Sequence, residues 1–216
     1  MTSPRLAIFD VDGTLTRGPN IWQHLLEQAG VWHGAGEANL ARFVGGEIDY
    51  DEFCRLDAGL LVGQRYDDLR RHAAGVPVFA GLDDVFGFLA ARGFRIALLS
   101  SGLRVLTDVF AARYPVDAVL VNDLGQQDGS CTGEGIVTVP WHGKAGLTEA
   151  LIAQFGAQTV VTFGDSGADV PVFERADVGV AVNATDARLL ALAHVHVTGD
   201  DLSVCLPELA ALLDGR

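Results

Sequence analysis

The sequence has little positive charge. Its 216 residues include 15 lysines and arginines against 28 aspartates and glutamates, for a formal net charge of −13. Polyanionic partners such as nucleic acids and anionic membrane surfaces need a basic face on the protein. We therefore expect no nucleic-acid partner and no membrane partner. An anionic substrate would have to be held locally, by a metal ion, a lysine or backbone N–H groups.

Long apolar runs and paired cysteines are also missing. No uninterrupted apolar run approaches the ~20 residues that cross a bilayer, and residues 1–5 are too short and polar for a signal peptide. Cys54, Cys131 and Cys205 are widely spaced, odd in number and without CxxC spacing, so we expect reduced thiols. These absences predict a soluble cytoplasmic protein, while the sequence indicates nothing about its oligomeric state.

The most informative stretch is Leu6–Leu15, which reads LAIFDVDGTL. An apolar run typical of a buried strand ends in Asp10 and Asp12, and Gly13 and Thr14 then indicate a turn. Two carboxylates ~4 Å apart repel by roughly 4 kcal/mol at an effective dielectric constant of about 20, so a cation or a shared proton should lie between them. Mg²⁺ suits oxygen ligands best. The alternative is a turn of the Asx type with no chemical role.

A helical insertion follows this stretch. Between Ile21 and His72 the β-branched runs give way to helical periodicity, and Pro19 before it and Gly75 and Pro77 after it suit hinges. We predict a helical cap domain at residues 17–76, inserted into a core domain of residues 1–16 and 77–216. The expected cap helices are Ile21–Gly30, Glu37–Val44, Tyr50–Leu61 and Tyr66–Ala74.

Strand and helix patterns alternate in the rest of the chain. This alternation implies parallel βαβ units, and hence an α/β fold with a Rossmann-like, doubly wound, mostly parallel sheet. A short β-hairpin interrupts it at Asp123–Val139, with Asp128-Gly129 as its turn. The expected strands are Phe94–Leu99, Val116–Val121, Thr159–Phe163, Val178–Val182 and His194–Val197. The expected helices are Leu82–Arg92, Val105–Ala112, Lys144–Phe155, Val170–Ala176, Asp186–Ala193 and Leu202–Leu213.

Three further segments carry polar groups at strand or helix ends. Ser100, Ser101 and Gly102 end a strand just before a helix, where an anion is favoured, although a serine there can also serve only as an N-cap. Lys144 is the first residue of a predicted helix, where the helix macrodipole disfavours a cation. This unfavourable position indicates that its charge has another use, although the ordinary interpretation of such a lysine is that it is exposed to solvent. The strand before GDSGAD ends in two more carboxylates, Asp165 and Asp169.

In this order and spacing, DVDGTL, Ser100, Lys144 and GDSGAD resemble the four motifs of the haloacid dehalogenase (HAD) superfamily. The segments GEIDYDEF and DGSCTGE are most similar to its phosphoserine phosphatase branch. The resemblance implies a Mg²⁺-dependent phosphatase that acts on a small phosphorylated metabolite. It makes Asp10 the nucleophile and Asp12 the general acid and base. It implies that Lys144 contacts the phosphate, and that further phosphate contacts come from Thr14, Ser100, Ser101 and Gly102. It also implies that Mg²⁺ is bound by Asp10, the Asp12 carbonyl and Asp165, with Asp169 supporting the metal from its outer shell.

The resemblance weakens at the groups that select the substrate. Pro19 stands where phosphoserine phosphatases have a cap glutamate, Asp57 where they have a cap arginine, and Ala168 replaces a frequent asparagine. These departures favour another small phosphomonoester over phosphoserine. Other cap residues that could select it are Arg17, Asn20, Trp22, His24, Trp32, His33, Arg42 and Arg55.

Two other functions stay open on this scaffold. In a phosphotransferase or mutase, a second substrate hydroxyl replaces water. In a non-catalytic phospho-acceptor resembling a response-regulator receiver, the aspartyl-phosphate is long-lived. Asp12 and the helical cap argue against the receiver, which needs no general acid and no covered site.

Overall fold

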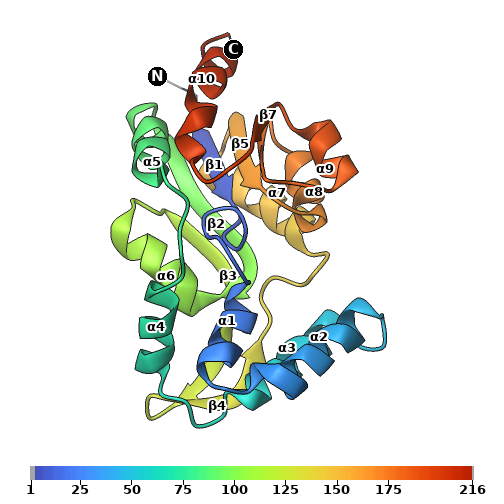
Figure 1. The fold of residues 1–216 in the computed structure, drawn as a ribbon. Helices are drawn as coiled ribbons and strands as arrows, with labels where there is room; N and C mark the ends of the chain where they lie inside the picture. The colour runs from blue at the N-terminus through green and yellow to red at the C-terminus, as the bar shows by residue number, and fades with distance from the viewer. Residues whose placement is uncertain (1–2, 216) are drawn as a thin grey trace.

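A computed structural model describes residues 3–215 and places seven strands in one sheet, in the order β4-β3-β2-β1-β5-β6-β7. All neighbouring pairs are parallel except β3 and β4. The α/β, doubly wound, mostly parallel fold is thereby confirmed (Figure 1). The strands are β1 (Arg5–Phe9), β2 (Phe94–Leu103), β3 (Ala118–Gln127), β4 (Ser130–Ile136), β5 (Thr159–Gly164), β6 (Val178–Val182) and β7 (Val195–Val197).

The helices fall into two groups. Near the N-terminus are α1 (Ile21–Gln28), α2 (Glu37–Val44), α3 (Tyr50–Leu60) and α4 (Tyr66–Ala74), with a π-helical turn at Trp32–Gly36. Around the sheet are α5 (Leu82–Ala91), α6 (Arg104–Arg113), α7 (Lys144–Phe155), α8 (Val170–Phe173), α9 (Ala187–Leu192) and α10 (Leu206–Asp214), with 3₁₀ turns at Gly167–Asp169 and Leu202–Cys205. Within residues 3–215, no helix combines the length and the apolar character that a membrane span requires.

The central strand β1 is buried on both faces because successive side chains of a strand point to opposite sides. Ala7 and Phe9 belong to the apolar cluster that includes the helices α5, α6 and α10, whereas Leu6 and Ile8 pack with α7 and α8. Phe9 also stacks on Phe163 of β5, with ring centroids 4.3 Å apart. This two-sided burial explains why β1 reads as a continuous apolar run.

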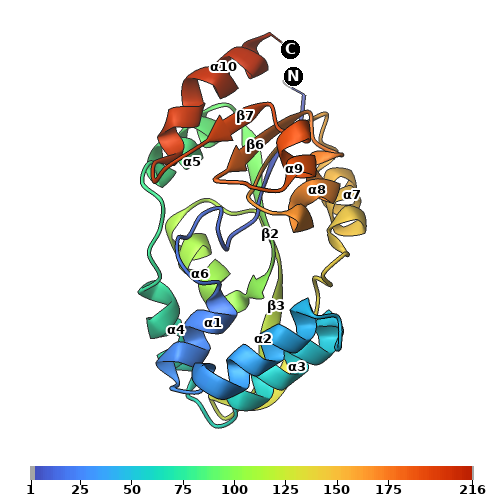
Figure 2. The ribbon, with the colours of Figure 1, turned by 45° about the vertical axis from the view of Figure 1, so that its right-hand side comes forward.

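The chain reverses its direction of winding at β1. From β1 it continues to β2, β3 and β4 on one side, and it later returns to β5, β6 and β7 on the other. Such a switch point opens a crevice at the carboxyl ends of the strands. The helices α1, α2 and α3 lie beyond that end of the sheet (Figure 2).

The structure extends two of the expected strands. We expected β2 to end at Leu99, but after an irregularity in register it continues to Leu103, which pairs with Asn122. We expected the next strand at Val116–Val121, but β3 runs from Ala118 to Gln127 because it continues into the hairpin with β4. Two of the expected helices also differ: α8 is one turn only, and the final expected helix begins as a 3₁₀ turn.

The expected hairpin turn is confirmed. Asp128 and Gly129 both have positive φ, 51° and 75°, as a two-residue type I′ turn requires. The hairpin lies against the N-terminal helices, since a side chain at Gly135 of β4 would meet the carbonyl oxygen of Cys54 on α3. The helices α1–α3 and the β3–β4 hairpin lie together in the lower part of Figure 1.

Asp57 is a fully buried carboxyl on α3. Asn39 of α2 donates to its Oδ1 at 2.8 Å, and its Oδ2 has no hydrogen-bond partner. Burial raises the pKa of Asp57 from 3.8 to about 6, although the hydrogen bond from Asn39 acts in the opposite direction. The carboxyl therefore fixes α2 to α3 at a cost in stability when it is ionised.

We predict that Asp57→Asn stabilises the protein at pH 8 by about 1 kcal/mol. A carboxyl whose pKa is higher in the folded than in the unfolded protein stabilises the folded state at pH values below its unfolded-state pKa. This stabilisation is lost as the pH rises through the folded-state pKa. The gain from the substitution should thus vanish near pH 4 and appear between pH 4 and 7. Urea unfolding across this range measures it, with Asp214→Asn on the exposed end of α10 as the matched control. A gain that is the same at every pH would contradict this account.

Candidate active site

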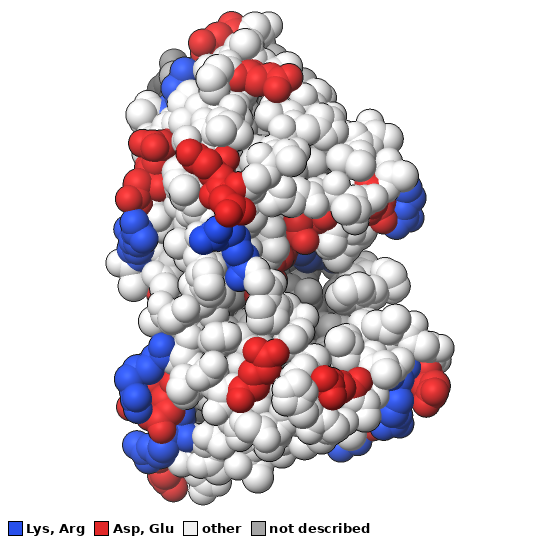
Figure 3. Space-filling view, in the orientation of Figure 1, with Lys and Arg blue, Asp and Glu red and all other residues white. Residues whose placement is uncertain are grey.

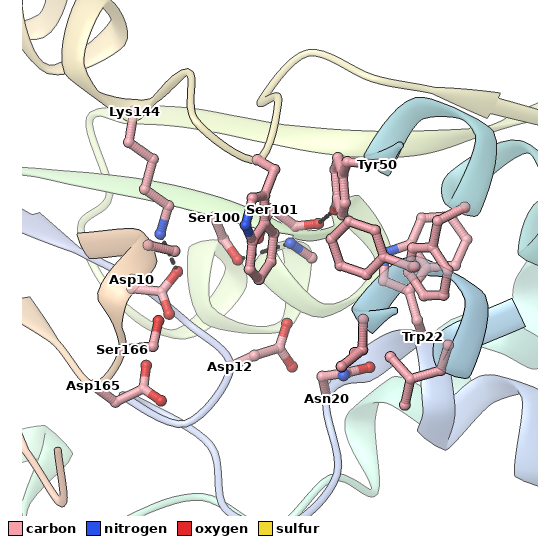
Figure 4. A pocket seen from close by; sticks show the side chains of 17 residues that line it. Asp10, Asp12, Asn20, Trp22, Tyr50, Ser100, Ser101, Lys144, Asp165 and Ser166 are labelled. Atoms are coloured by element: carbon pink, nitrogen blue, oxygen red, sulfur yellow. Dashed lines mark hydrogen bonds and ion pairs between the residues drawn. The ribbon is translucent and has the colours of Figure 1, made fainter. Parts of the chain in front are cut away.

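A cavity of about 280 Å³ lies between the carboxyl edge of the sheet and the helices α1–α3 (Figure 4). Its wall on the sheet side is polar and its wall on the helix side is mostly apolar. The sheet side comprises Asp10, Asp12, Ser100, Ser101, Gly102, Lys144, Asp165, Ser166 and Ala168, with Trp141 from the loop before α7. The helix side comprises Asn20, Trp22, Leu40, Phe43, Val44, Tyr50 and Phe53.

Lys144 is the centre of the polar wall. Its ammonium group donates to Asp10 Oδ1 at 2.8 Å and to Asp169 Oδ1 at 2.7 Å, and all three side chains are at least nine-tenths buried. Although burial alone would lower it, the pKa of Lys144 is raised by Asp10 and Asp169, so the ammonium stays charged. In the sequence Lys144 lies 134 positions from Asp10 and 25 positions from Asp169, and the fold joins the three residues in one ion-pair network.

Asp169 also fixes the loop after β5. Its Oδ2 accepts hydrogen bonds from the backbone N–H groups of Asp165 and Ser166, both at 3.2 Å. A side chain at Gly164 would lie 2.7 Å from the Asp169 Cβ, so only glycine allows this approach. Asp169 thus orients both Lys144 and Asp165, in keeping with the supporting role that the resemblance gives it.

Asp165 faces Asp10 across the site. Carboxylate oxygens of Asp10, Asp165 and Asp169 lie within 4.8 Å of one another. Thr14 does not line the cavity: its buried hydroxyl donates to Asp165 Oδ1 at 3.2 Å, so it reaches the site through that carboxylate.

The cluster carries more negative charge than its cation balances. Burial raises the pKa of Asp165, and the charges of Asp10 and Asp169 raise it further. Burial likewise raises the pKa of Asp10, although Lys144 opposes the shift. Lys144 is the only lysine in the chain. Crowded hard oxygen donors with one buried cation among them fit a further divalent cation such as Mg²⁺.

Asp12 lies between the sheet and the helices. Its Oδ1 accepts a hydrogen bond from the backbone N–H of Ile21, the first residue of α1, at 2.8 Å. Burial raises the pKa of Asp12 to about 7, and the nearby charge of Asp10 adds to the shift. A side chain at Gly102 would collide with Asp12 Oδ2, so this glycine makes room for the carboxyl.

The end of β2 supplies the hydroxyl groups predicted from the sequence. Ser100 is buried, and its Oγ accepts a hydrogen bond from the Gly102 N–H at 3.0 Å, which closes a tight loop inside the strand. The carbonyl of Ser101 accepts from the Tyr50 hydroxyl at 2.6 Å and from Asn122 Nδ2 at 3.0 Å. Ser101 and Gly102 thus belong to the strand itself and not to the loop after it.

Asn122 is a supporting residue that the sequence reasoning missed. Besides Ser101, it holds the loop after β4, because its Oδ1 accepts from the N–H groups of Thr138 and Val139 at 2.8 and 2.7 Å. In the sequence, an asparagine that directly follows the apolar residues of AVLVNDL could have indicated this supporting role.

Trp141 was also missed. It lines the cavity, with its ring centroid 5.3 Å from that of Phe43 and 5.5 Å from that of Tyr50.

A comparison with known protein families shows the family of the chain. The family model of haloacid dehalogenase-like hydrolases matches residues 7–174, and the chain belongs to that family. The matched range includes the four residues on which the resemblance rests, Asp10, Ser100, Lys144 and Asp165.

Several relatives of the chain are named as phosphoserine phosphatases. The chain is 28% identical over 186 residues to the one from Archaeoglobus fulgidus, an alignment that covers 84% of this chain and 53% of that protein. It is 27% identical to the one from Lactococcus lactis, with 99% of each chain covered. A solved phospho-aspartyl intermediate analogue of phosphoserine phosphatase has the same fold, with a TM-score of 0.80 at 20% identity over 95% of this chain and 99% of that one. The chain spans about half the length of the phosphoserine phosphatase from Archaeoglobus fulgidus.

We predict that Lys144→Met destabilises the protein by about 3 kcal/mol, because it leaves two buried carboxylates without their cation. Mg²⁺ should reduce the loss, because it supplies positive charge to the same carboxylates. Urea unfolding at pH 7.5 with and without Mg²⁺ measures both effects.

The matched control is Arg95→Met, which removes a largely exposed partner of Asp117. Such a pair contributes about 0–1 kcal/mol. If Lys144→Met cost no more than Arg95→Met, Lys144 would not be the electrostatic centre of the site.

Proposed function

We propose that the chain is a Mg²⁺-dependent phosphomonoesterase that hydrolyses a small phosphorylated metabolite through an aspartyl-phosphate on Asp10. The observation that carries the proposal is the contact of Lys144 with Asp10 at 2.8 Å, at the floor of a cavity whose wall also holds Asp12 and Asp165. The relatives named as phosphoserine phosphatases support the same chemistry.

In the first half-reaction, a carboxylate oxygen of Asp10 attacks phosphorus and the bond to the leaving alcohol oxygen breaks. Asp12 gives its proton to that oxygen, so the alcohol leaves neutral. The hydrogen bond from Ile21 N–H holds the Asp12 carboxyl at the cavity wall, and Gly102 leaves it space. A carboxyl with a pKa near 7 is suited to both giving and taking a proton at neutral pH.

In the second half-reaction, water attacks the phosphorus of the aspartyl-phosphate. Asp12 takes the proton from that water, the bond to Asp10 breaks, and inorganic phosphate is released. Asp10 returns as a carboxylate and Asp12 as an acid, so both groups are ready for the next substrate. Two easier displacements thereby replace one difficult displacement.

Positive charge and N–H groups would hold the phosphoryl oxygens. Lys144 and the end of β2 around Ser100 provide them, because phosphoryl transfer depends on positioning and electrostatics. Asp10, Asp165 and the carbonyl of Asp12 would hold Mg²⁺, with Asp169 behind them. When bound, the ion offsets the repulsion between the anionic nucleophile and the phosphate.

We predict that Asp10→Asn lowers phosphate release from small phosphomonoesters at least about a thousandfold, because an amide cannot serve as the nucleophile. Phosphate release in the presence of Mg²⁺ measures the effect across a panel that includes phosphoserine. Addition of glycerol in the same assay tests the phosphotransferase alternative, which would form glycerol phosphate in place of free phosphate.

The control is Asp84→Asn, which makes the same change at an exposed position on α5 and should keep the wild-type rate. An Asp10→Asn protein that turns over at a rate near that of the wild type would rule out Asp10 as the nucleophile.

A further inference from the structure

The cap side of the cavity, defined as the seven residues from Asn20 to Phe53 that line it, carries no charged side chain. Its members are Asn20, Trp22, Leu40, Phe43, Val44, Tyr50 and Phe53. In the view of Figure 3, the lower lobe is likewise free of charged atoms along the edge that borders the central hollow. The part of a substrate that extends from the phosphate towards the cap therefore meets aliphatic and aromatic surface.

The polar atoms on this side are neutral. The Tyr50 hydroxyl is already used, since it donates to the Ser101 carbonyl at 2.6 Å, and burial raises its pKa well above the usual value. Trp22 is 4% exposed and its Nε1 has no hydrogen-bond partner within the protein. Asn20 caps α1 through its Oδ1. None of these groups compensates a charge on the ligand.

The cap arginines named from the sequence point to other partners. Arg55 makes two hydrogen bonds of 2.6 Å to Glu52 on the exposed face of α3. Arg17 binds Asp200 at 2.7 Å, and Arg42 lies 3.8 Å from Glu47. None of the three lines the cavity. Asp57, at the position aligned with the specificity arginine, is buried between α2 and α3 and does not line it either.

The charges on the opposite wall are not available to an amino acid. Lys144 is held by Asp10 and Asp169, and the remaining charged groups there are the carboxylates of the reaction site. A bound phosphoserine would have to leave its ammonium and its carboxylate without free counter-charges in the cavity, and burying unpaired charge is costly.

Resting on the proposed function, we propose that the substrate is a phosphomonoester of an uncharged alcohol with an apolar body, such as an aryl or branched alkyl group. Five aromatic side chains line the cavity that would hold this body: Trp22, Phe43, Tyr50, Phe53 and Trp141. The rings of Phe43 and Phe53 are stacked 5.2 Å apart, and those of Trp22 and Phe53 are tilted 6.5 Å apart, so the wall is a continuous aromatic surface. The cavity volume of about 280 Å³ limits the alcohol to a small one.

The test compares 2-phenylethyl phosphate with phosphoserine, both primary alkyl phosphates, on the wild-type protein with Mg²⁺ and with Asp10→Asn as the blank. Serine is the better leaving alcohol, so a preference for the phenylethyl ester reflects binding and not leaving-group chemistry. We expect its kcat/KM to be at least about tenfold higher. If phosphoserine is preferred, this inference fails and the proposed function stands. If neither ester gives phosphate that depends on Asp10, the proposed function fails as well.

A pair of valines on the cap gives matched variants. Val44 lines the cavity and Val62 does not, and both are exposed, by 76% and 61%, so an arginine at either position does not disturb the core. Val44→Arg should raise the KM for 2-phenylethyl phosphate several-fold and shift the kcat/KM ratio towards phosphoserine, whose carboxylate gains a partner. Val62→Arg should leave the ratio unchanged. An unchanged ratio in Val44→Arg, or the same shift in both variants, would contradict an apolar substrate site at this wall.

Discussion

The structure depends on one buried cation. Lys144 lies at the N-terminus of α7, where the helix dipole disfavours its charge, and it is compensated by Asp10 after β1 and Asp169 after β5. Removing a charge from water is costly unless it is paired and hydrogen-bonded. The network therefore requires the ends of β1 and β5 and the start of α7 to meet, and this meeting fixes Asp10 at the floor of the cavity.

The parallel sheet provides that meeting point. Because β1 lies between β2 and β5 and all three run in the same direction, Asp10, Ser100 and Asp165 emerge at one edge although they are far apart in sequence. The helices beyond that edge contribute no charge to the cavity wall. In the proposed function the protein thus separates two tasks: the sheet side would supply the groups for phosphoryl chemistry, and the cap side would supply the surface that the rest of the substrate contacts.

Much of the sheet side could be predicted from the sequence, because each motif is a short local pattern of an apolar strand followed by polar residues. The order of Asp10, Ser100, Lys144 and Asp165 carried the family assignment. The cap side was less predictable, since its wall depends on how α2 and α3 pack, and this packing involves Asp57 with Asn39 and a π-helical turn with Gly34 at φ 93°. The extension of β2 to Leu103 was missed because its pairing with β3 across an irregular register is not a local property.

The most direct test of the account is to identify the phosphorylated side chain. The wild-type protein is mixed with Mg²⁺ and a phosphomonoester that it turns over, quenched in acid within the first turnovers, and digested for peptide mass spectrometry. The account predicts an acid-stable, base-labile phosphoryl group on Asp10, absent when the ester is omitted. Turnover without a phosphorylated Asp10, or with the phosphoryl group on another side chain, would contradict the central claim.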